Sequence, residues 1–416
     1  MHIAHFTNTY YPVISGVVRS VSAFRQALSD LGHIVFVFAQ NAPNYEDQEP
    51  FIFRYPALNL GLPGDFPATI PFSPSMDNLF PPLKVEVIHS HHPILLGQAA
   101  ANKSEEYGLP LVFTFHTRYR EYSHYFPLSQ DVVQGFVKDT IDSWLKYYIS
   151  RCHHIIAPSE SIRQILISEY GVKNRITVIP TGIQLELFQK PAGRSIRQER
   201  DWGDDFVLIS VGRLAKEKNW GTLLEAFKAV SLNHPKARLV IIGDGPERVD
   251  LQDLIVDLDL WRKVDLVGKV PFDQIPDYLK AADLFCFASI SETQGLVTVE
   301  AMAAGLPVVA VDATGTQDVL EHDKEGLLTE NDSQALAQAI QVVLEDEELR
   351  GRYKEAALQK AKSFAIQALA KKLIEVYQQA LEAQKANVFV EVEGEPKGEP
   401  KKTWRWVSRG IRSGES

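Results

Sequence analysis

Two cations and two carboxylates in the second half of the chain have spacings that suit a charged ligand. Arg213 and Lys218 lie five positions apart after an apolar segment, where two cations could bind a diphosphate. Glu292 and Glu300 lie eight positions apart, and carboxylates accept hydrogen bonds from hydroxyl groups. Because carboxylates repel phosphate, we expect Glu292 to hold a sugar and Glu300 a ribose on either side of the diphosphate.

The two glutamates belong to a loop and helix that follow a strand. An apolar strand is expected at 284–287 and a helix at 296–304, which ends at a Gly-Leu-Pro sequence. In a strand, helix, strand unit this loop meets the positive end of the helix, where unpaired backbone N–H groups favour an anion. Gly295, Leu296 and Val297 would supply those groups, and Gly295 has no side chain to keep a phosphate away.

Composition limits the class of protein. The chain has 416 residues, 45% hydrophobic and 23% charged, which predicts two domains with full cores. A net charge of −10 argues against general nucleic-acid binding. No run of 18 apolar residues predicts a membrane span, and the N-terminus lacks the basic region of a signal peptide. We therefore expect a cytoplasmic protein.

Strands and helices alternate from end to end, which predicts an α/β fold of two Rossmann-like domains facing a central cleft. The domains are expected at 1–184 and 205–363, joined by a charged, glycine-bearing linker at 185–204. A polar tail at 384–416 is expected to be disordered. The first helix is expected at 19–31, and the nicotinamide fingerprint G-x-G-x-x-G is absent after the first strand.

The stretch 288–310, with Glu, seven residues, Glu and a glycine three after the first Glu, resembles the donor-site motif of retaining glycosyltransferases of the GT-B type, family four. The resemblance covers about residues 1–380. It implies that Arg213 and Lys218, in a G-R-L-x-x-x-K sequence, bind the donor phosphates. It also implies that helix 364–383, predicted within a helical stretch at 347–381, crosses back to the first domain.

The same resemblance assigns two residues of the first domain. Gly16 is similar to the glycine of the family's opening loop, whose backbone approaches the diphosphate. His116, after a strand at 110–115, is similar to the active-site histidine that lies against the transferred sugar and the acceptor. The family keeps the anomeric configuration without a covalent nucleophile, and the departing phosphate oxygen helps to remove the acceptor proton.

No metal and no cofactor is expected, because basic residues and helix ends balance the donor's charge. Asp257 and Asp259 form a D-x-D sequence inside a helical window, so we do not assign a metal there. Three histidines follow one strand, at His89, His91 and His92. Strand residues alternate sides and no Cys or Asp completes a ligand set, so these histidines are expected to shape the cleft.

The acceptor is expected to contact an aromatic and basic segment at 117–127. Its pattern resembles the H-T-x-Y-x-x-Y-x-H-Y sequence of bacterial glucosyltransferases that act on diacylglycerol. The expected acceptor-binding residues are Tyr119, Arg120, Tyr122, His124 and Tyr125. The tail adds lysines and arginines around Trp404 and Trp406, which suit an anionic bilayer. A segment packed on its own domain and a solvated tail are the alternatives.

The resemblance implies UDP-glucose as donor, diacylglycerol or a glycosyl-diacylglycerol as acceptor, and peripheral association with a membrane. Two other functions stay open. One is a glycosyltransferase with a soluble or polysaccharide-precursor acceptor and the same donor site. The other is a non-catalytic nucleotide-sugar sensor, although a sensor need not keep the complete set of donor residues.

Overall fold

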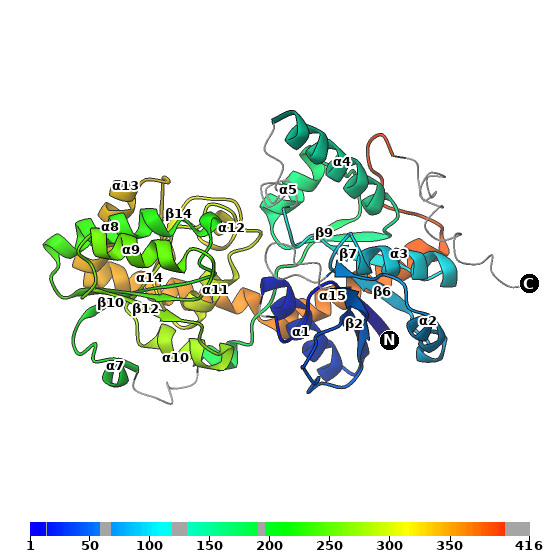
Figure 1. Cartoon of the computed structure of the whole chain (residues 1–416), viewed down its shortest axis with the longest axis horizontal. Helices are drawn as coiled ribbons and strands as arrows, with labels where there is room; N and C mark the ends of the chain where they lie inside the picture. The colour runs from blue at the N-terminus through cyan, green and yellow to red at the C-terminus, as the bar shows by residue number, and fades with distance from the viewer. Residues whose placement is uncertain (14, 59–67, 119–130, 190–195, 396–416) are drawn as a thin grey trace, which may run out of the picture. The chain divides into compact units, whose positions relative to one another are not determined.

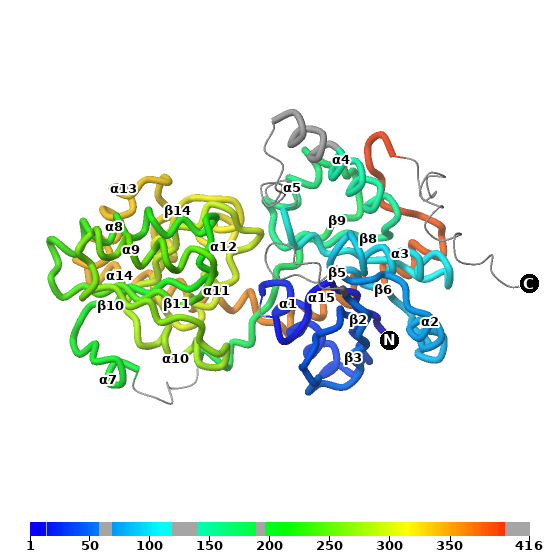
Figure 2. The backbone as a smooth tube through the Cα atoms, viewed as in Figure 1, coloured from blue at the N-terminus to red at the C-terminus, as the bar shows by residue number. Residues whose placement is uncertain are grey.

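The structure is a computed structural model that describes residues 1–13, 15–58, 68–118, 131–189 and 196–395. The chain divides into two compact units (Figures 1 and 2). The first comprises Met1–Pro158, Arg163–Ile179 and Lys372–Ser416, and the second comprises Ser159–Ile162 and Pro180–Lys371. Apart from the short piece Ser159–Ile162, at the start of α5, the chain enters the second unit after Ile179 and returns to the first within its last described helix.

Seven described strands of the first unit form one parallel sheet in the order β3-β2-β1-β6-β7-β8-β9. The strands are β1 His2–Thr7, β2 Ile34–Gln40, β3 Ile52–Tyr55, β6 Val87–Ser90, β7 Leu111–Thr114, β8 His154–Ala157 and β9 Ile176–Val178. The helices are α1 Gly16–Asp30, α2 Pro74–Leu79, α3 Leu96–Tyr107, α4 Asp131–Ser150 and α5 Glu160–Ser168, with a 3-10 turn at Pro81–Leu83. A short antiparallel pair, β4 Ala57–Leu58 and β5 Ala68–Thr69, lies outside the main sheet.

Six described strands of the second unit form a parallel sheet in the order β12-β11-β10-β13-β14-β15. They are β10 Phe206–Val211, β11 Ala237–Ile242, β12 Val264–Gly268, β13 Leu284–Phe287, β14 Val308–Val311 and β15 Gly326–Thr329. The helices are α6 Leu185–Gln189, α7 Ile196–Glu199, α8 Trp220–Asn233, α9 Arg248–Asp257, α10 Ile275–Lys280, α11 Leu296–Ala303, α12 Thr316–Val319, α13 Ser333–Glu345 and α14 Glu347–Ala361. The last described helix, α15 Ile366–Lys385, begins in the second unit and belongs to the first from Lys372 onward. Short 3-10 turns cover Lys216–Lys218, Phe272–Gln274 and Lys362–Phe364.

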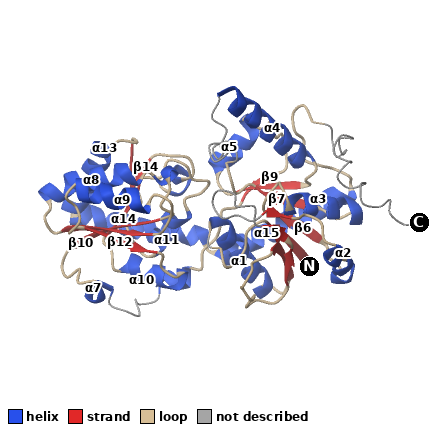
Figure 3. Ribbon diagram, in the orientation of Figure 1, coloured by secondary structure: helices blue, strands red, loops and turns tan. Residues whose placement is uncertain are grey.

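The second unit buries both faces of its sheet, because successive strand residues point to opposite sides. In β13, Leu284 and Cys286 belong to a core that α8, α9 and α13 cover. Phe285 and Phe287 belong to the opposite core, which α10, α11 and part of α14 cover. Figure 3 shows helices on both sides of these strands. Continuous apolar strands of this kind are typical of parallel sheets with two covered faces.

Both sheets have the strand order of a Rossmann fold, so the predicted α/β class with two Rossmann-like domains is confirmed. In each sheet the strand order reverses once. The reversal lies between β1 and β6 in the first unit and between β10 and β13 in the second. Loops diverge to opposite faces at such a point, which leaves room at the carboxyl ends of the two strands for a ligand.

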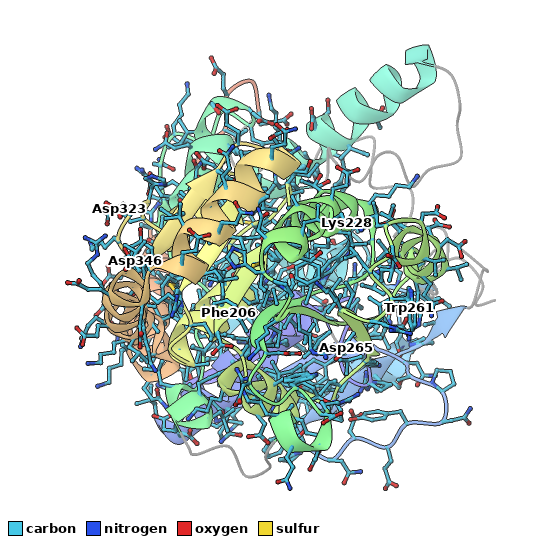
Figure 4. The ribbon with its side chains drawn as sticks, turned by 90° about the vertical axis from the view of Figure 1, so that its left-hand side faces the viewer. Phe206, Lys228, Trp261, Asp265, Asp323 and Asp346 are labelled. Carbon is cyan, nitrogen blue, oxygen red and sulfur yellow. The ribbon has the colours of Figure 1, made fainter. Side chains whose placement is uncertain are left out.

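Side chains at the edges of the second unit stabilise its helices and sheet. Asp346 caps α14, because its Oδ1 accepts the backbone N–H of Leu349 at 2.9 Å. The guanidinium of Arg350 in α14 lies 5.3 Å from the ring centre of Phe206, the first residue of β10. Figure 4 labels Asp346 and Phe206 on this side of the molecule. The described residues include no helix both long enough and apolar enough to cross a bilayer.

Two helix boundaries differ from those predicted. The first helix begins at Gly16 and not at residue 19, because the Ser15 hydroxyl accepts the Val18 N–H and caps the helix earlier. The helical stretch expected at 347–381 is two helices, α14 and α15, separated by a 3-10 turn at Lys362–Phe364. Ala365 is extended, with a ψ of 121°, and this breaks the helix. The D-x-D sequence is helical only to Asp257, the last residue of α9.

Two expected connecting segments pack against a unit. The linker expected at 185–204 contributes Phe188, Ile196 and Trp202 to one core of the second unit. The tail expected to be polar from residue 384 includes Val390 and Val392, which are 1% and 7% exposed. The described part of the tail also pairs through its backbone with residues 152 and 171–173. Apolar side chains inside charged surroundings were sufficient to anchor both segments.

Removing residues 386–416 should destabilise the first unit. Loss of Val390 and Val392 exposes the surface that they cover, at about 1.5–3 kcal/mol for each buried valine as an upper estimate. Thermal unfolding should therefore begin roughly 5–10 °C lower. The matched control ends at Glu395, so that comparison of the two truncated chains isolates residues 386–395. Equal melting temperatures for both would contradict the packing role.

Candidate functional site

Two loops of the second unit fix the backbone beside Arg213. Trp220 donates its indole N–H to the Arg213 carbonyl at 3.0 Å, and the Leu214 N–H donates to the Asp244 carbonyl at 3.1 Å. Gly243 has a φ of +147°, and a Cβ there would lie 1.8 Å from the Gly212 carbonyl oxygen. The loops after β10 and β11 therefore meet backbone to backbone, and the Arg213 side chain extends from a fixed position into solvent.

Lys218 and Glu292 form an ion pair across the point where the strand order reverses. Lys218 Nζ donates to Glu292 Oε1, and the Ser289 hydroxyl donates to the same oxygen at 2.8 Å. The two charged side chains are only 18% and 15% exposed. Partial burial and a second hydrogen bond make such a pair stronger than one at the surface. The loops after β10 and β13 thus come together through two residues predicted for the site.

The helix after this loop begins as predicted. Gly295 is the N-cap of α11 with a φ of +75°, which favours glycine. Leu296 and Val297 follow as its first two residues, whose N–H groups have no acceptor within the helix. A Cβ on Gly315 would lie 2.6 Å from the Glu292 carbonyl oxygen, so the loop before α12 supports the loop that carries Glu292.

Glu300 differs from the other charged residues of the site. It lies in α11, one turn beyond Leu296, and is 1% exposed. Its side chain is therefore almost completely buried within the unit. Gln294 is also buried, and its amide forms two hydrogen bonds to the backbone of Thr181, at 2.6 and 2.9 Å. This clamp anchors the loop ahead of α11.

In the first unit the predicted histidine lies at the end of β7. His116 Nε2 is 2.9 Å from His91 Nδ1, and His91 Nε2 is 3.0 Å from His5 Nδ1. The predicted glycine, Gly16, is the first residue of α1, and among the described residues nothing lies within 4 Å of a Cβ built there. The internal packing of the unit therefore does not require glycine at this position.

Burial keeps the histidines at these strand ends neutral. Loss of hydration lowers the pKa of His116 and of His5 to about 3 and that of His92 to about 4. The same cause holds the pKa values of His89 and His91 well below the usual range. A backbone N–H, that of Asn8, donates to the Nδ1 of His92 at 3.1 Å, which requires an unprotonated nitrogen. At neutral pH these imidazoles therefore act through hydrogen bonds.

Three of these histidines have the spacing of metal ligands. Ring nitrogens of His5, His89 and His91 all lie within 4.8 Å of one another. However, each ring nitrogen already has a hydrogen-bond partner, supplied by another histidine, by Thr114 or by Tyr377. A metal ion would have to replace these hydrogen bonds, so the geometry favours a hydrogen-bonded cluster.

Several residues of this site were absent from the sequence prediction. Ser289 and Gln294 orient the predicted loop, but their types alone carry no chemical signal. His5 lies in a predicted strand among apolar residues, so nothing marks it as a site residue. Tyr377 has the helical spacing of a core residue and is equally unmarked. The expected acceptor residues, from Tyr119 to Tyr125, lie outside the described residues, as does the basic segment with Trp404 and Trp406.

The arrangement in the second unit can bind an anion that carries a hydroxyl-rich group. Arg213, Lys218 and the start of α11 offer positive charge and N–H groups, and Glu292 offers an acceptor beside them. These groups flank the carboxyl ends of β10 and β13, the position that open α/β sheets use for ligands. A diphosphate with a sugar attached fits this combination of charges.

Comparisons with known proteins agree with this chemistry. A family model described as glycosyl transferases group 1 matches residues 194–360, and one described as glycosyltransferase family 4 matches residues 14–187. The chain is 33% identical over 320 residues to an alpha-monoglucosyldiacylglycerol synthase of Streptococcus pneumoniae. The aligned region covers 74% of this chain and 71% of that protein. It is 30% identical over 391 residues to the alpha-monoglucosyldiacylglycerol synthase of Acholeplasma laidlawii, with 91% and 96% covered. Among solved structures, HepE of Anabaena in complex with UDP and glucose has a TM-score of 0.72 at 22% identity, with 91% and 99% covered.

Acidification from pH 7 to pH 4 should destabilise the first unit. In this window unfolded histidines, with a pKa near 6.5, bind protons that the folded ones do not, so the free energy of unfolding falls as the pH falls. Each histidine adds at most about 1.4 kcal/mol per pH unit. In the His92→Asn variant an amide oxygen can accept the Asn8 N–H, and one titrating group is gone. Its melting temperature should fall less steeply with acid than that of the wild type.

The control for this measurement is His234→Gln, which removes a histidine of the second unit. This variant reports how far loss of a histidine outside the buried cluster changes the dependence of the melting temperature on pH. Identical slopes for wild type and His92→Asn would show that protonation of the buried histidine does not contribute.

Proposed function

This chain belongs to the GT-B glycosyltransferases described by the group 1 and family 4 models, and from that premise we propose that it transfers glucose from UDP-glucose to a membrane lipid. The proposed acceptor is diacylglycerol or a glycosyl-diacylglycerol. The names of the two synthases support a lipid acceptor, and the UDP and glucose bound to HepE support the donor. The observation that carries the donor assignment is the Lys218–Glu292 pair beside the start of α11.

In the proposed donor complex the diphosphate binds Arg213 and Lys218. As the glycosidic C–O bond breaks, negative charge grows on the leaving diphosphate, and fixed cations and N–H groups stabilise it. The N–H groups of residues 295–297 and the backbone at Gly16 are proposed to join them. Since these groups balance the charge, the reaction is proposed to need no metal ion and no further cofactor.

The carboxylates are proposed to bind the hydroxyl groups around the diphosphate. Glu292 would accept hydrogen bonds from the transferred sugar, and Glu300 would accept them from the ribose. His116 is proposed to orient the sugar, and its low pKa means that it contacts the sugar as a neutral imidazole. Retention is proposed to occur by attack on the face that the diphosphate leaves, with a phosphate oxygen taking the acceptor's proton.

The acceptor is proposed to reach the enzyme from a membrane surface. Tyr119, Arg120, Tyr122, His124 and Tyr125 combine aromatic rings and basic groups, which suit the headgroup level of a bilayer. The enzyme would then work at the cytoplasmic face of a membrane as a peripheral protein, without nucleic acid as a partner.

Neutral replacements of the two cations should weaken nucleotide binding. The double variant Arg213→Gln, Lys218→Met removes two charge-assisted hydrogen bonds to phosphate, so its Kd for UDP should rise about 100-fold. Isothermal titration calorimetry measures this directly. The control is Lys228→Met, which removes a lysine from the middle of α8, labelled in Figure 4. Unchanged UDP affinity in the double variant would overturn the donor site.

A second variant separates binding of the diphosphate from contact with the sugar. Glu292→Gln removes the carboxylate that pairs with Lys218, so UDP should bind as tightly as before or more tightly. Transfer should slow, because an amide is a weaker acceptor for the sugar hydroxyls than a carboxylate.

The enzyme should transfer the label of UDP-glucose to diacylglycerol or to a glycosyl-diacylglycerol. In separate reactions, the enzyme and labelled UDP-glucose are incubated with vesicles that contain diacylglycerol, with vesicles that contain a glucosyl-diacylglycerol, or with soluble sugars. Transfer to lipid alone supports the proposal. Transfer to soluble sugars alone would replace the lipid acceptor, and binding of UDP-glucose without transfer or slow hydrolysis would indicate a sensor.

A further inference from the structure

A row of hydrogen bonds runs from His116 into the interior of the first unit. Beyond His91 and His5 it continues through the Tyr377 hydroxyl, which is 3.2 Å from His5 Nε2 and 2.8 Å from His89 Nδ1. His89 Nε2 then lies 2.7 Å from the Thr114 hydroxyl, where the row ends. The order of the row is Thr114, His89, Tyr377, His5, His91 and His116.

The protons of this row can be counted. Six groups in the order above share five hydrogen bonds, and each neutral imidazole or hydroxyl brings one proton. Burial raises the pKa of Tyr377, so its hydroxyl keeps its proton. Each inner imidazole has both nitrogens within the row, so its proton must serve one of its two bonds. Tyr377 has no third partner among the described residues, and the spare proton therefore lies at one end of the row.

The two ends are not equivalent. If the spare proton were on Thr114, its buried hydroxyl would need another acceptor, and His89 is the one partner that the described residues give it. A buried donor without an acceptor is costly. If the spare proton is on His116, it lies on Nδ1 of the row's one half-buried imidazole. Every hydroxyl and N–H within the row then has an acceptor.

We propose that this row fixes His116 as its Nδ1–H tautomer, so that His116 meets the substrate as a hydrogen-bond donor and not as a base. Thr114, His89, Tyr377, His5 and His91 are then positioning residues that act through His116. In this state every imidazole of the row carries its proton on Nδ1, because each donates from that nitrogen toward His116. The proposal rests on the proposed contact between His116 and the transferred sugar or the acceptor.

The Nδ1–H tautomer of His116 excludes this residue as the base that removes the acceptor's proton. With Nδ1 protonated and Nε2 occupied by the His91 N–H, His116 has no free lone pair to remove the acceptor's proton. The proton must go to another base, and the departing phosphate oxygen is the group already proposed for that role. His116 instead donates a hydrogen bond to a hydroxyl oxygen and holds it in place.

Nuclear magnetic resonance of the whole chain labelled with 15N-histidine tests the tautomers without any substrate. At pH 7, long-range 1H–15N correlations should show a protonated Nδ1 and an unprotonated Nε2 for His5, His89, His91 and His116, assigned through single histidine variants. A protonated Nε2 on His116 would overturn the proposal. Zinc retained at one ion per chain by these nitrogens would overturn it as well.

The Tyr377→Phe variant removes the hydroxyl that joins the two halves of the row. His5 Nε2 then loses its donor, and either tautomer of the His5, His91 and His116 segment leaves one buried nitrogen unpaired. His116 should therefore become a mixture of tautomers. The control is Tyr148→Phe, because Tyr148 is equally buried in the same unit and donates to the Gly97 carbonyl. If Tyr377→Phe does not fold, Thr114→Val removes the donor at the far end and should give a mixture too.

Kinetics supply the second readout. In Tyr377→Phe, kcat/KM for transfer should fall about twofold if half of His116 loses the Nδ1–H, because only the Nδ1–H fraction is competent. A single, unchanged tautomer in the variant would overturn the proposal. Absence of transfer by the wild type would instead refute the proposed function, and the tautomer measurement would still decide the state of His116.

Discussion

The reversal of strand order in each parallel sheet determines where polar chemistry can lie. At that point neighbouring strands send their loops to opposite faces, so the carboxyl ends of the strands are not covered by a crossing connection. In the second unit the reversal brings Lys218 to Glu292, and in the first it brings His5 to His91. In the second unit, the buried residues that line both faces of the sheet are mainly apolar and contribute packing.

The two units use polar groups in opposite ways. Lys218 and Glu292 are partly solvated and form an ion pair with each other. The histidines of the first unit are more deeply buried, where an unpaired charge would be costly, and they satisfy one another as neutral groups. The first arrangement suits a charged leaving group, and the second suits the orientation of hydroxyl groups.

Sequence patterns predicted what is local and missed what depends on distant contacts. Arg213, Lys218 and Glu292 lie in the loops that follow apolar parallel strands, so their shared edge follows from the parallel fold. The partnership of His5 with Tyr377 joins residues 372 positions apart, and Tyr377 alone is indistinguishable from a core tyrosine. In the expected linker and in the described part of the expected tail, apolar residues such as Trp202 and Val390 are buried, which the polar majority around them did not indicate.

The close approach of Gly243 to Gly212 has a consequence for attempts to alter donor preference by random mutagenesis. A side chain at residue 243 would collide with the neighbouring main chain and shift Arg213, and one at Gly315 would displace the main chain at Glu292. Libraries that vary these two glycines would lose function through backbone disorder before any new sugar was sampled. Diversity is better introduced at neighbours such as Leu296 and Val297, which are partly buried against the apolar core but are not pressed against a neighbouring main chain.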